Sequence, residues 1–152
     1  MPRVKGKSVQ GFPLSALVPK RMVGQHTQIY EELLQGAASL TGEIKQGAIR
    51  ISLTNKASAH KMPTGKYGDY RVVLTTTVVD DADKTVFSKQ EIFSTLKESG
   101  IPFRKTVAFE YPLTLVAGKE YTAKATLTYQ VEGRPDRAMA TWSAPAGGGT
   151  ER

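Results

Sequence analysis

The stretch Tyr121-Thr122-Ala123-Lys124-Ala125-Thr126-Leu127-Thr128-Tyr129-Gln130-Val131 alternates strictly between apolar or aromatic and polar side chains. Successive side chains of a β-strand point to opposite faces of the sheet, so this pattern predicts a strand with one buried face and one solvated face. Gly118 precedes it as a turn residue. Because the same period recurs along the chain, this stretch decides the fold class.

Three further stretches alternate in the same way, namely Ile49–Asn55, Tyr70–Val79 and Val107–Leu115. Pro112 lies within the last of them, and a proline cannot donate to a strand ladder, so that strand is expected at a sheet edge. A final short strand is expected over Arg137–Trp142. Six or seven half-buried strands predict an all-β fold, an antiparallel β-sandwich of Ig-like architecture.

Two segments are interpreted as helical or ambiguous. Residues 27–40 place Ile29, Leu33 and Ala37 at helical spacing, which predicts a short helix before the sandwich. Residues 90–97 are compatible with a second short helix, and a loop is expected after them. We expect an extended N-terminal arm over residues 1–25, the sandwich with its leading helix over residues 26–143, and a disordered tail over residues 144–152.

The composition limits what the chain can be. Its 152 residues, 39% of them hydrophobic, are enough for one domain with a real core. No apolar run approaches the ~20 residues that span a bilayer, so no transmembrane segment is expected. No apolar stretch of a signal peptide follows the basic N-terminus, so none is expected in this chain. There is no cysteine, which excludes disulfides and covalent haem attachment through Cys-x-x-Cys-His.

The chain is basic, with a formal net charge of +7 and a pI of about 9.7. Such a charge draws a protein towards polyanions or acidic partners. The basic residues are scattered, however, and form no helical stripe and no aromatic-rich strand typical of nucleic-acid binding. We therefore expect no nucleic-acid partner.

The chain has two histidines, His26 and His60. His60 follows a predicted strand, in the turn Ala59-His60-Lys61-Met62-Pro63-Thr64-Gly65, where proline fixes one backbone angle and glycine permits a positive one. A neutral imidazole suits iron, zinc or copper. A protein metal site needs more ligands than these two, whereas two histidines suffice if each completes the axial coordination of a haem held elsewhere. The alternative role for each is a hydrogen-bonded turn residue.

No catalytic signature is present. The chain has no P-loop spacing and no nucleophile elbow, so we expect no enzyme. Asp80-Asp81-Ala82-Asp83-Lys84 lacks the glycine and glutamate of a calcium loop and is typical of a solvated hairpin turn. Four aromatic side chains raise the question of a sugar-binding face, although their strand positions favour core packing; they are Tyr111, Tyr121, Tyr129 and Trp142.

The segment from His26 to Arg71 resembles the C-terminal β-domain of a group of bacterial and archaeal multihaem c-type cytochromes. In that group an upstream histidine precedes a short helix, and a strand ending in asparagine leads to a Gly/Ala-His-x-x-Pro-Thr-Gly turn before an arginine opens the next strand. The matching positions here are Asn55, His60, Pro63, Thr64, Gly65 and Arg71. A late Ala-x-Leu-x-Tyr strand matches at residues 125–129, and the resemblance covers roughly residues 26–131.

The resemblance implies a haem-free structural or interaction module of an extracytoplasmic (periplasmic or cell-surface) electron-transfer assembly. The chain would be a separate subunit or a fragment of a longer cytochrome. Its partners would be a multihaem c-type cytochrome or further copies of itself. By analogy, His60 and His26 would be axial ligands to a haem c bound by another polypeptide, and the other matched residues would shape the turn. The alternative function is a β-sandwich module that binds polysaccharide or cell-surface partners without haem.

Overall fold

A computed structural model describes residues 3–6, 21–24, 31–45, 47–56, 60–64 and 68–146. The chain divides into two compact units, residues 1–30 and residues 31–152. In the first unit, β1 (Arg3–Gly6) and β2 (Arg21–Gly24) pair antiparallel, with Val4 opposite Val23. The predicted arm therefore contains a two-stranded sheet. The predicted boundary between residues 25 and 26 lies outside the described residues.

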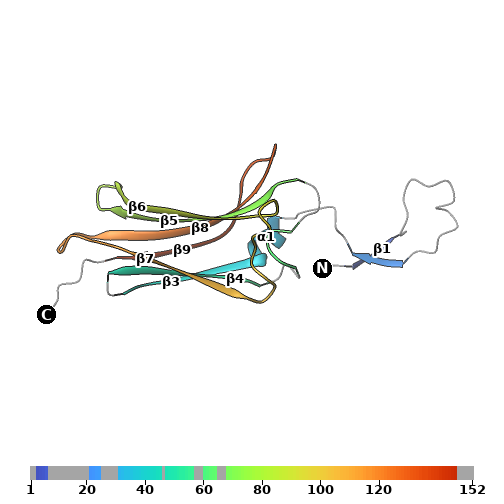
Figure 1. The fold of residues 1–152 in the computed structure, drawn as a ribbon, viewed down its shortest axis with the longest axis horizontal. Coiled ribbons are helices and arrows are strands. Elements are labelled where there is room, and N and C mark those ends of the chain that lie inside the picture. Colours follow the sequence, from blue (N-terminus) through green and yellow to red (C-terminus); the bar gives the residue numbers. More distant parts are fainter. Residues whose placement is uncertain are drawn as a thin grey trace. The chain divides into compact units, whose positions relative to one another are not determined.

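The second unit is the predicted antiparallel β-sandwich with one short helix (Figure 1). Its elements are α1 (Glu31–Ala37), β3 (Ala38–Lys45), β4 (Ala48–Asn55), β5 (Tyr70–Asp80), β6 (Thr85–Ser94), β7 (Thr106–Pro112), β8 (Tyr121–Val131) and β9 (Arg137–Pro145). One layer is the sheet β3-β4-β7, and the other is the sheet β6-β5-β8-β9. The connections β4–β5, β6–β7 and β7–β8 cross between the layers, which is the connectivity of Ig-like sandwiches.

The core lies between the two sheets and comes from the alternating faces of their central strands. Nine apolar side chains from β4, β5 and β8 have no exposed surface: Ile49, Ile51, Leu53, Val72, Leu74, Val78, Ala123, Ala125 and Leu127. These are the inward positions expected from the period of two. The prediction that Pro112 marks an edge strand is confirmed, because β7 pairs with β4 on one side only.

The predicted short helix before the sandwich is confirmed but ends earlier than expected, and the segment that the sequence left ambiguous is a strand. The helix stops at Ala37, and β3 begins at Ala38, because Ala38 to Lys45 pair along their whole length with β4. Residues 90–94 belong to β6, where they pair with β5, and turns follow at residues 95–98. In both segments, pairing with a neighbouring strand outweighs the local preference for a helix. The predicted helix start at residues 27–30 lies outside the described residues.

At its C-terminal end the sandwich continues into the segment expected to be a tail. β9 runs to Pro145, and the buried Ala146 donates its N–H to the Tyr121 carbonyl over 2.8 Å. The remainder of that segment, residues 147–152, lies outside the described residues. Among the described helices, none combines the length and apolar character needed to cross a membrane.

Candidate functional site

The candidate site is organised by Asn55, the last residue of β4, whose side chain is fully buried. Its Nδ2 donates to two carbonyl oxygens, that of His60 at 2.8 Å and that of Ile101 at 2.9 Å. Its backbone N–H donates to the Lys105 carbonyl at 3.1 Å, and its own carbonyl accepts from the Arg104 N–H at 2.9 Å. One side chain thus holds the turn that carries His60 and the connection between β6 and β7.

We call residues 60–64 the His60 turn and Thr95–Lys105 the β6–β7 loop. They are joined by an antiparallel bridge between Met62 and Ile101, whose N–H groups donate to each other's carbonyls at 2.9 and 2.8 Å. Both side chains are buried, and so is Pro63, which follows Met62 through a cis peptide bond. The His60 turn is therefore anchored in the core by the buried Met62 and Pro63 and by the hydrogen bond that Asn55 donates to the His60 carbonyl.

Gly100 allows the two segments to approach closely. A Cβ at this position would lie 2.8 Å from Lys61 Cγ and 3.0 Å from the Met62 carbonyl oxygen, closer than such atoms pack. The Lys61 side chain also joins the two segments, because its ammonium group donates to the Glu98 carbonyl at 2.9 Å. A side chain at residue 100 would push the β6–β7 loop away from the His60 turn.

His60 is exposed at the end of the sandwich, while its carbonyl is held by Asn55. Thr64 is also exposed. Gly65 and His26 lie outside the described residues. The ligand role of His60 and His26 stays a prediction.

Arg71 is the second residue of β5, close to the place that the resemblance implies, and pairs with the carboxylate of Asp69. The Ser94 hydroxyl, at the end of β6, donates to the other Asp69 oxygen at 2.7 Å. The hydrogen bond from Arg71, and then that from Ser94, hold the pKa of the Asp69 carboxyl below its usual value. The matched arginine therefore serves a structural network that ties β5 to β6 below the His60 turn. Neither Asp69 nor Ser94 was identified from the sequence.

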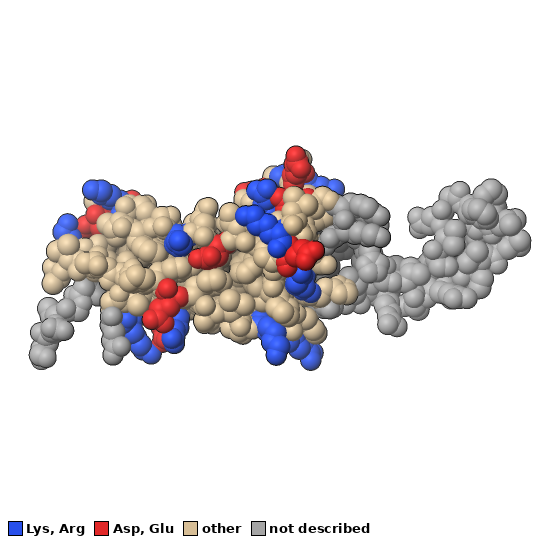
Figure 2. All heavy atoms as spheres, in the orientation of Figure 1, with Lys and Arg blue, Asp and Glu red and all other residues tan. Residues whose placement is uncertain are grey.

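The described connections around the His60 turn are basic and partly apolar. Five exposed cations lie in residues 56, 60–64 and 95–105, against one carboxylate, that of Glu98; the cations are Lys56, Lys61, Lys97, Arg104 and Lys105. Leu96 is 71% exposed and Phe103 is 37% exposed. The Arg104 guanidinium carbon lies 4.9 Å from the centre of the Phe103 ring. Figure 2 shows both Lys or Arg and Asp or Glu side chains at this end of the sandwich.

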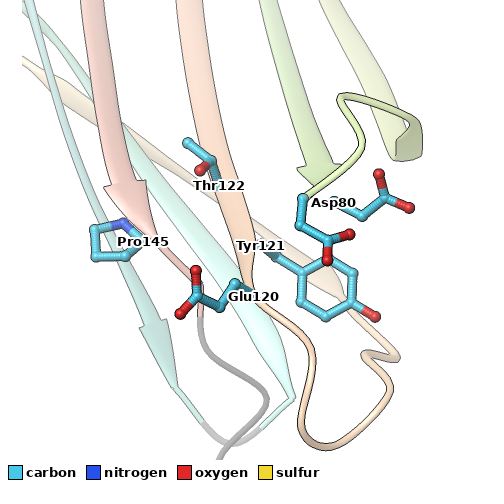
Figure 3. Close-up of a pocket in the computed structure, with 6 residues that line it drawn as sticks. Asp80, Glu120, Tyr121, Thr122 and Pro145 are labelled. Carbon is cyan, nitrogen blue, oxygen red and sulfur yellow. The ribbon is translucent and has the colours of Figure 1, made fainter.

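The opposite end of the sandwich carries a hollow lined mainly by acidic and polar side chains. The hollow is open and is lined by Asp80, Asp81, Glu120, Tyr121, Thr122 and Pro145 (Figure 3). The Asp80 carboxylate accepts the N–H groups of Ala82 and Lys84, at 3.1 and 2.9 Å, and so shapes the β5–β6 hairpin turn. Within the described part of the chain, no three His, Cys, Asp or Glu side chains are grouped to hold a metal ion.

The aromatic side chains considered for a sugar-binding face pack inwards. Tyr111 and Tyr121 are buried, and Tyr129 and Trp142 lie against the core. Burial raises the pKa of Tyr129, and it raises the pKa of Tyr111 together with the nearby Glu91 carboxylate. These four residues therefore offer no flat exposed platform of the kind that would favour polysaccharide binding.

The parts of the site that sequence reasoning missed lie in the β6–β7 loop. Ile101 is buried, although no period of two or 3.6 surrounds it. The one signal was an apolar pair, Ile101-Pro102, after a glycine in a segment expected to be a loop. Phe103 and Arg104 follow it directly.

Comparison with known proteins gives a fold but no family. No family model and no curated protein matches the chain. Among solved structures, it is similar to a penta-heme cytochrome c552 from Thermochromatium tepidum, with a TM-score of 0.61 and 15% identity over 82% of this chain and 43% of that one. The chain thus spans about two fifths of that cytochrome's length. At this identity the likeness shows a shared β-sandwich fold.

Two glycoside hydrolase structures also match, with lower scores. One is a glycosyl hydrolase family 2 member from Bacteroides cellulosilyticus, with a TM-score of 0.42 and 14% identity over 75% of this chain and 15% of that one. The other is a putative beta-galactosidase from Bacteroides fragilis, with a TM-score of 0.36 and 14% identity over 74% of this chain and 16% of that one.

Proposed function

We propose that the chain is a non-catalytic interaction module of an extracytoplasmic multihaem cytochrome assembly, in which His60 offers its imidazole to a haem iron held by another polypeptide. The observation that carries the proposal is the exposed His60, placed on a turn that Asn55 and the Met62–Ile101 bridge fix to the core. The sandwich shared with part of the penta-heme cytochrome is compatible with this role.

The residues present fit a haem supplied from outside. The chain has no cysteine, so it binds no haem c covalently, and one exposed imidazole is a sixth ligand rather than a complete site. The β6–β7 loop, which is joined to the His60 turn by the Met62–Ile101 bridge, presents the exposed ring of Phe103 with the Arg104 guanidinium over it. A bound haem would supply one-electron transfer, and an imidazole in the axial position would tune its reduction potential.

The contribution of the chain itself would be positional. Asn55 fixes the His60 carbonyl, and with it the direction in which the backbone presents the side chain. Such preorganisation lowers the entropy that is lost on binding, because the ligand needs no further ordering of its backbone. His26 would be a second axial ligand, supplied from the first unit of the chain.

A haem c peptide tests the proposal directly. The probe is a short peptide that carries its own proximal histidine and leaves the sixth position of the iron open. Titration with the protein is expected to convert its absorbance spectrum to the low-spin bis-imidazole form. His60→Ala should remove the part of this conversion that depends on His60, and His26→Ala separately measures the part that depends on His26.

The folding of each variant is checked by urea unfolding. The comparison holds if His60→Ala and the unaltered protein have equal unfolding midpoints. A low-spin conversion that persists undiminished in folded His60→Ala would overturn the ligand role. A spectrum that stays high-spin with the unaltered protein would also overturn it.

A further inference from the structure

The described loops at the two ends of the sandwich carry opposite charge. We call the end that carries the His60 turn and the β6–β7 loop the His60 end. Its turn and loop, with Lys56, hold five exposed cations against one carboxylate, and the β8–β9 turn at the same end adds Arg134 against Glu132 and Asp136, so the excess there is of positive charge. At the other end, the connections β3–β4, β5–β6 and β7–β8 hold more acids than bases. The charged residues described there, from Lys45 to Glu120, are Lys45, Asp80, Asp81, Asp83, Lys84, Lys119 and Glu120.

This asymmetry selects a partner by charge. A surface of one sign attracts a surface of the opposite sign and fixes its orientation during the encounter. Since the positive end is also the end that presents His60, the attraction and the imidazole act on the same partner surface. The described loops and strand ends at the opposite end hold four carboxylates against three lysines, so that end attracts an acidic surface less than the His60 end does, which disfavours reversed docking.

The exposed apolar side chains at the His60 end further limit the kind of partner that this surface fits. Leu96 is 71% exposed, the largest exposed fraction among the big apolar side chains of the described residues, and Phe103 is 37% exposed. Phe103 lies under the Arg104 guanidinium, so an apolar ring and a cation are presented together. Nucleic acid would require several bases stacked on aromatic rings, and one half-exposed ring provides little of this.

We propose that the His60 end docks on the propionate-bearing edge of a partner's haem, with Lys97, Arg104 and Lys105 facing the propionate carboxylates and Leu96 and Phe103 facing the porphyrin edge. This rests on the proposed function. A haem edge joins an apolar ring system to two carboxylates, which matches the pairing of side chains here. An arginine suits such carboxylates because its planar fork donates two parallel hydrogen bonds.

The backbone around these cations is fixed by contacts already described. The Arg104 N–H donates to the Asn55 carbonyl, and the Lys105 carbonyl accepts from the Asn55 N–H, at 2.9 and 3.1 Å. His60 is held by the side chain of the same Asn55. The backbones of His60, Arg104 and Lys105 are thus all hydrogen-bonded to Asn55, and their positions relative to one another are set before any partner binds.

The test compares two triple variants of equal net charge. Lys97→Glu/Arg104→Glu/Lys105→Glu reverses the His60 end, and Lys84→Glu/Lys119→Glu/Lys124→Glu reverses exposed lysines away from it. Both are titrated with the haem c peptide at low and high salt. The first should bind at least about tenfold more weakly at low salt, as expected for three surface charge pairs lost, and the second should change about twofold or less. At high salt the unaltered protein and the two triple variants should bind the peptide with similar affinities.

A chemically altered probe provides the decisive comparison. Esterifying the two propionates removes their charges while leaving the iron and the porphyrin ring in place. The three proteins should then bind the probe equally, still through His60. A difference that survives esterification would overturn the propionate assignment, and so would equal weakening by both triple variants.

The two proposals fail in different ways. Low-spin conversion that depends on His60 but is insensitive to the first triple variant would overturn the docking inference and leave the ligand role standing. Conversion that does not need His60 would overturn the ligand role. Tighter binding of the unaltered protein to an anionic vesicle or a single-stranded oligonucleotide than to the haem peptide, lost in the first triple variant, would assign the basic end to a polyanion instead.

Discussion

Gly42 of β3 lies directly against the Trp142 indole of β9: a Cβ on Gly42 would stand 2.7 Å from Trp142 Cζ2 and 2.9 Å from Ile51 Cδ1. The two edge strands of opposite sheets meet at this contact, and only a residue without a side chain fits between them.

Gly42→Ala is therefore expected to lower the free energy of unfolding by about 1–3 kcal/mol, because an added methyl group in a filled space displaces its neighbours. Urea unfolding followed by the fluorescence of the single tryptophan measures it. Gly36→Ala is the matched control: among the described residues outside its own helix, no atom lies within 4 Å of its would-be Cβ, and it should raise stability by about 0.5–1 kcal/mol as a helix substitution. A stable Gly42→Ala would show that the indole can move aside.

Thr76 lies on the buried face of β5, and its hydroxyl has no hydrogen-bond partner among the described residues. A buried hydroxyl without a partner costs about 1–3 kcal/mol, so Thr76→Val should stabilise the sandwich by roughly 1 kcal/mol. Thermal or urea unfolding checks this, with Thr77→Val on the half-buried outer face expected to change little. A destabilised Thr76→Val would reveal a partner for the hydroxyl.

Asn55→Ala should cost about 2–4 kcal/mol of unfolding free energy, since it removes one hydrogen bond to each of two carbonyls and leaves them with one donor fewer. The neighbouring Thr54→Ala is the control. It removes only an exposed hydroxyl contact with Thr106 and should cost less than about 1 kcal/mol. Equal effects of the two variants would contradict the central role of Asn55.

Tyr111 connects the two edge strands β7 and β6 by donating its hydroxyl to Glu91 Oε1 at 3.2 Å. Burial, and then the Glu91 charge, raise the pKa of Tyr111 above the ordinary value of about 10. The neutral phenol is thus favoured by folding. Its contribution is complete below about pH 10 and is lost as the pH rises above that value, by up to about 1.4 kcal/mol per pH unit.

Tyr111→Phe should remove this dependence. Urea unfolding at about pH 8 and about pH 11 is expected to show a smaller loss of stability for the variant than for the unaltered protein. The raised pKa of Tyr129 and the titration of lysines contribute to both proteins and cancel in the difference. Equal losses of stability in the two proteins would contradict this prediction and mean that the Tyr111 hydroxyl is solvated.

The strands that the sequence predicted correctly are those in which side-chain alternation is complete. β4, β5 and β8 each bury a run of apolar residues at every second position, and that signal is local. β3 was missed because Ala38, Gly42 and other small residues carry little preference for a strand. Its existence depends on pairing with β4, a contact between segments that local propensity cannot represent.

The candidate site was predictable only in part. His60, Pro63 and Asn55 were identified from the turn and its flanks, and the structure gives Asn55 a buried role. Its second acceptor, Ile101, lies 46 positions further along the chain, in a segment without period. The charge on Lys97, Arg104 and Lys105 was visible in the sequence, but its location beside His60 follows from the crossover of β6 to β7 into the other sheet.

The bridge between Met62 and Ile101 has a consequence for how the His60 end moves. Its two amide protons lie in mutual hydrogen bonds next to buried side chains, so we expect them to exchange with solvent more slowly than the other amide protons of the described loops. A partner of the kind proposed above would then meet a backbone that keeps the same arrangement from one encounter to the next.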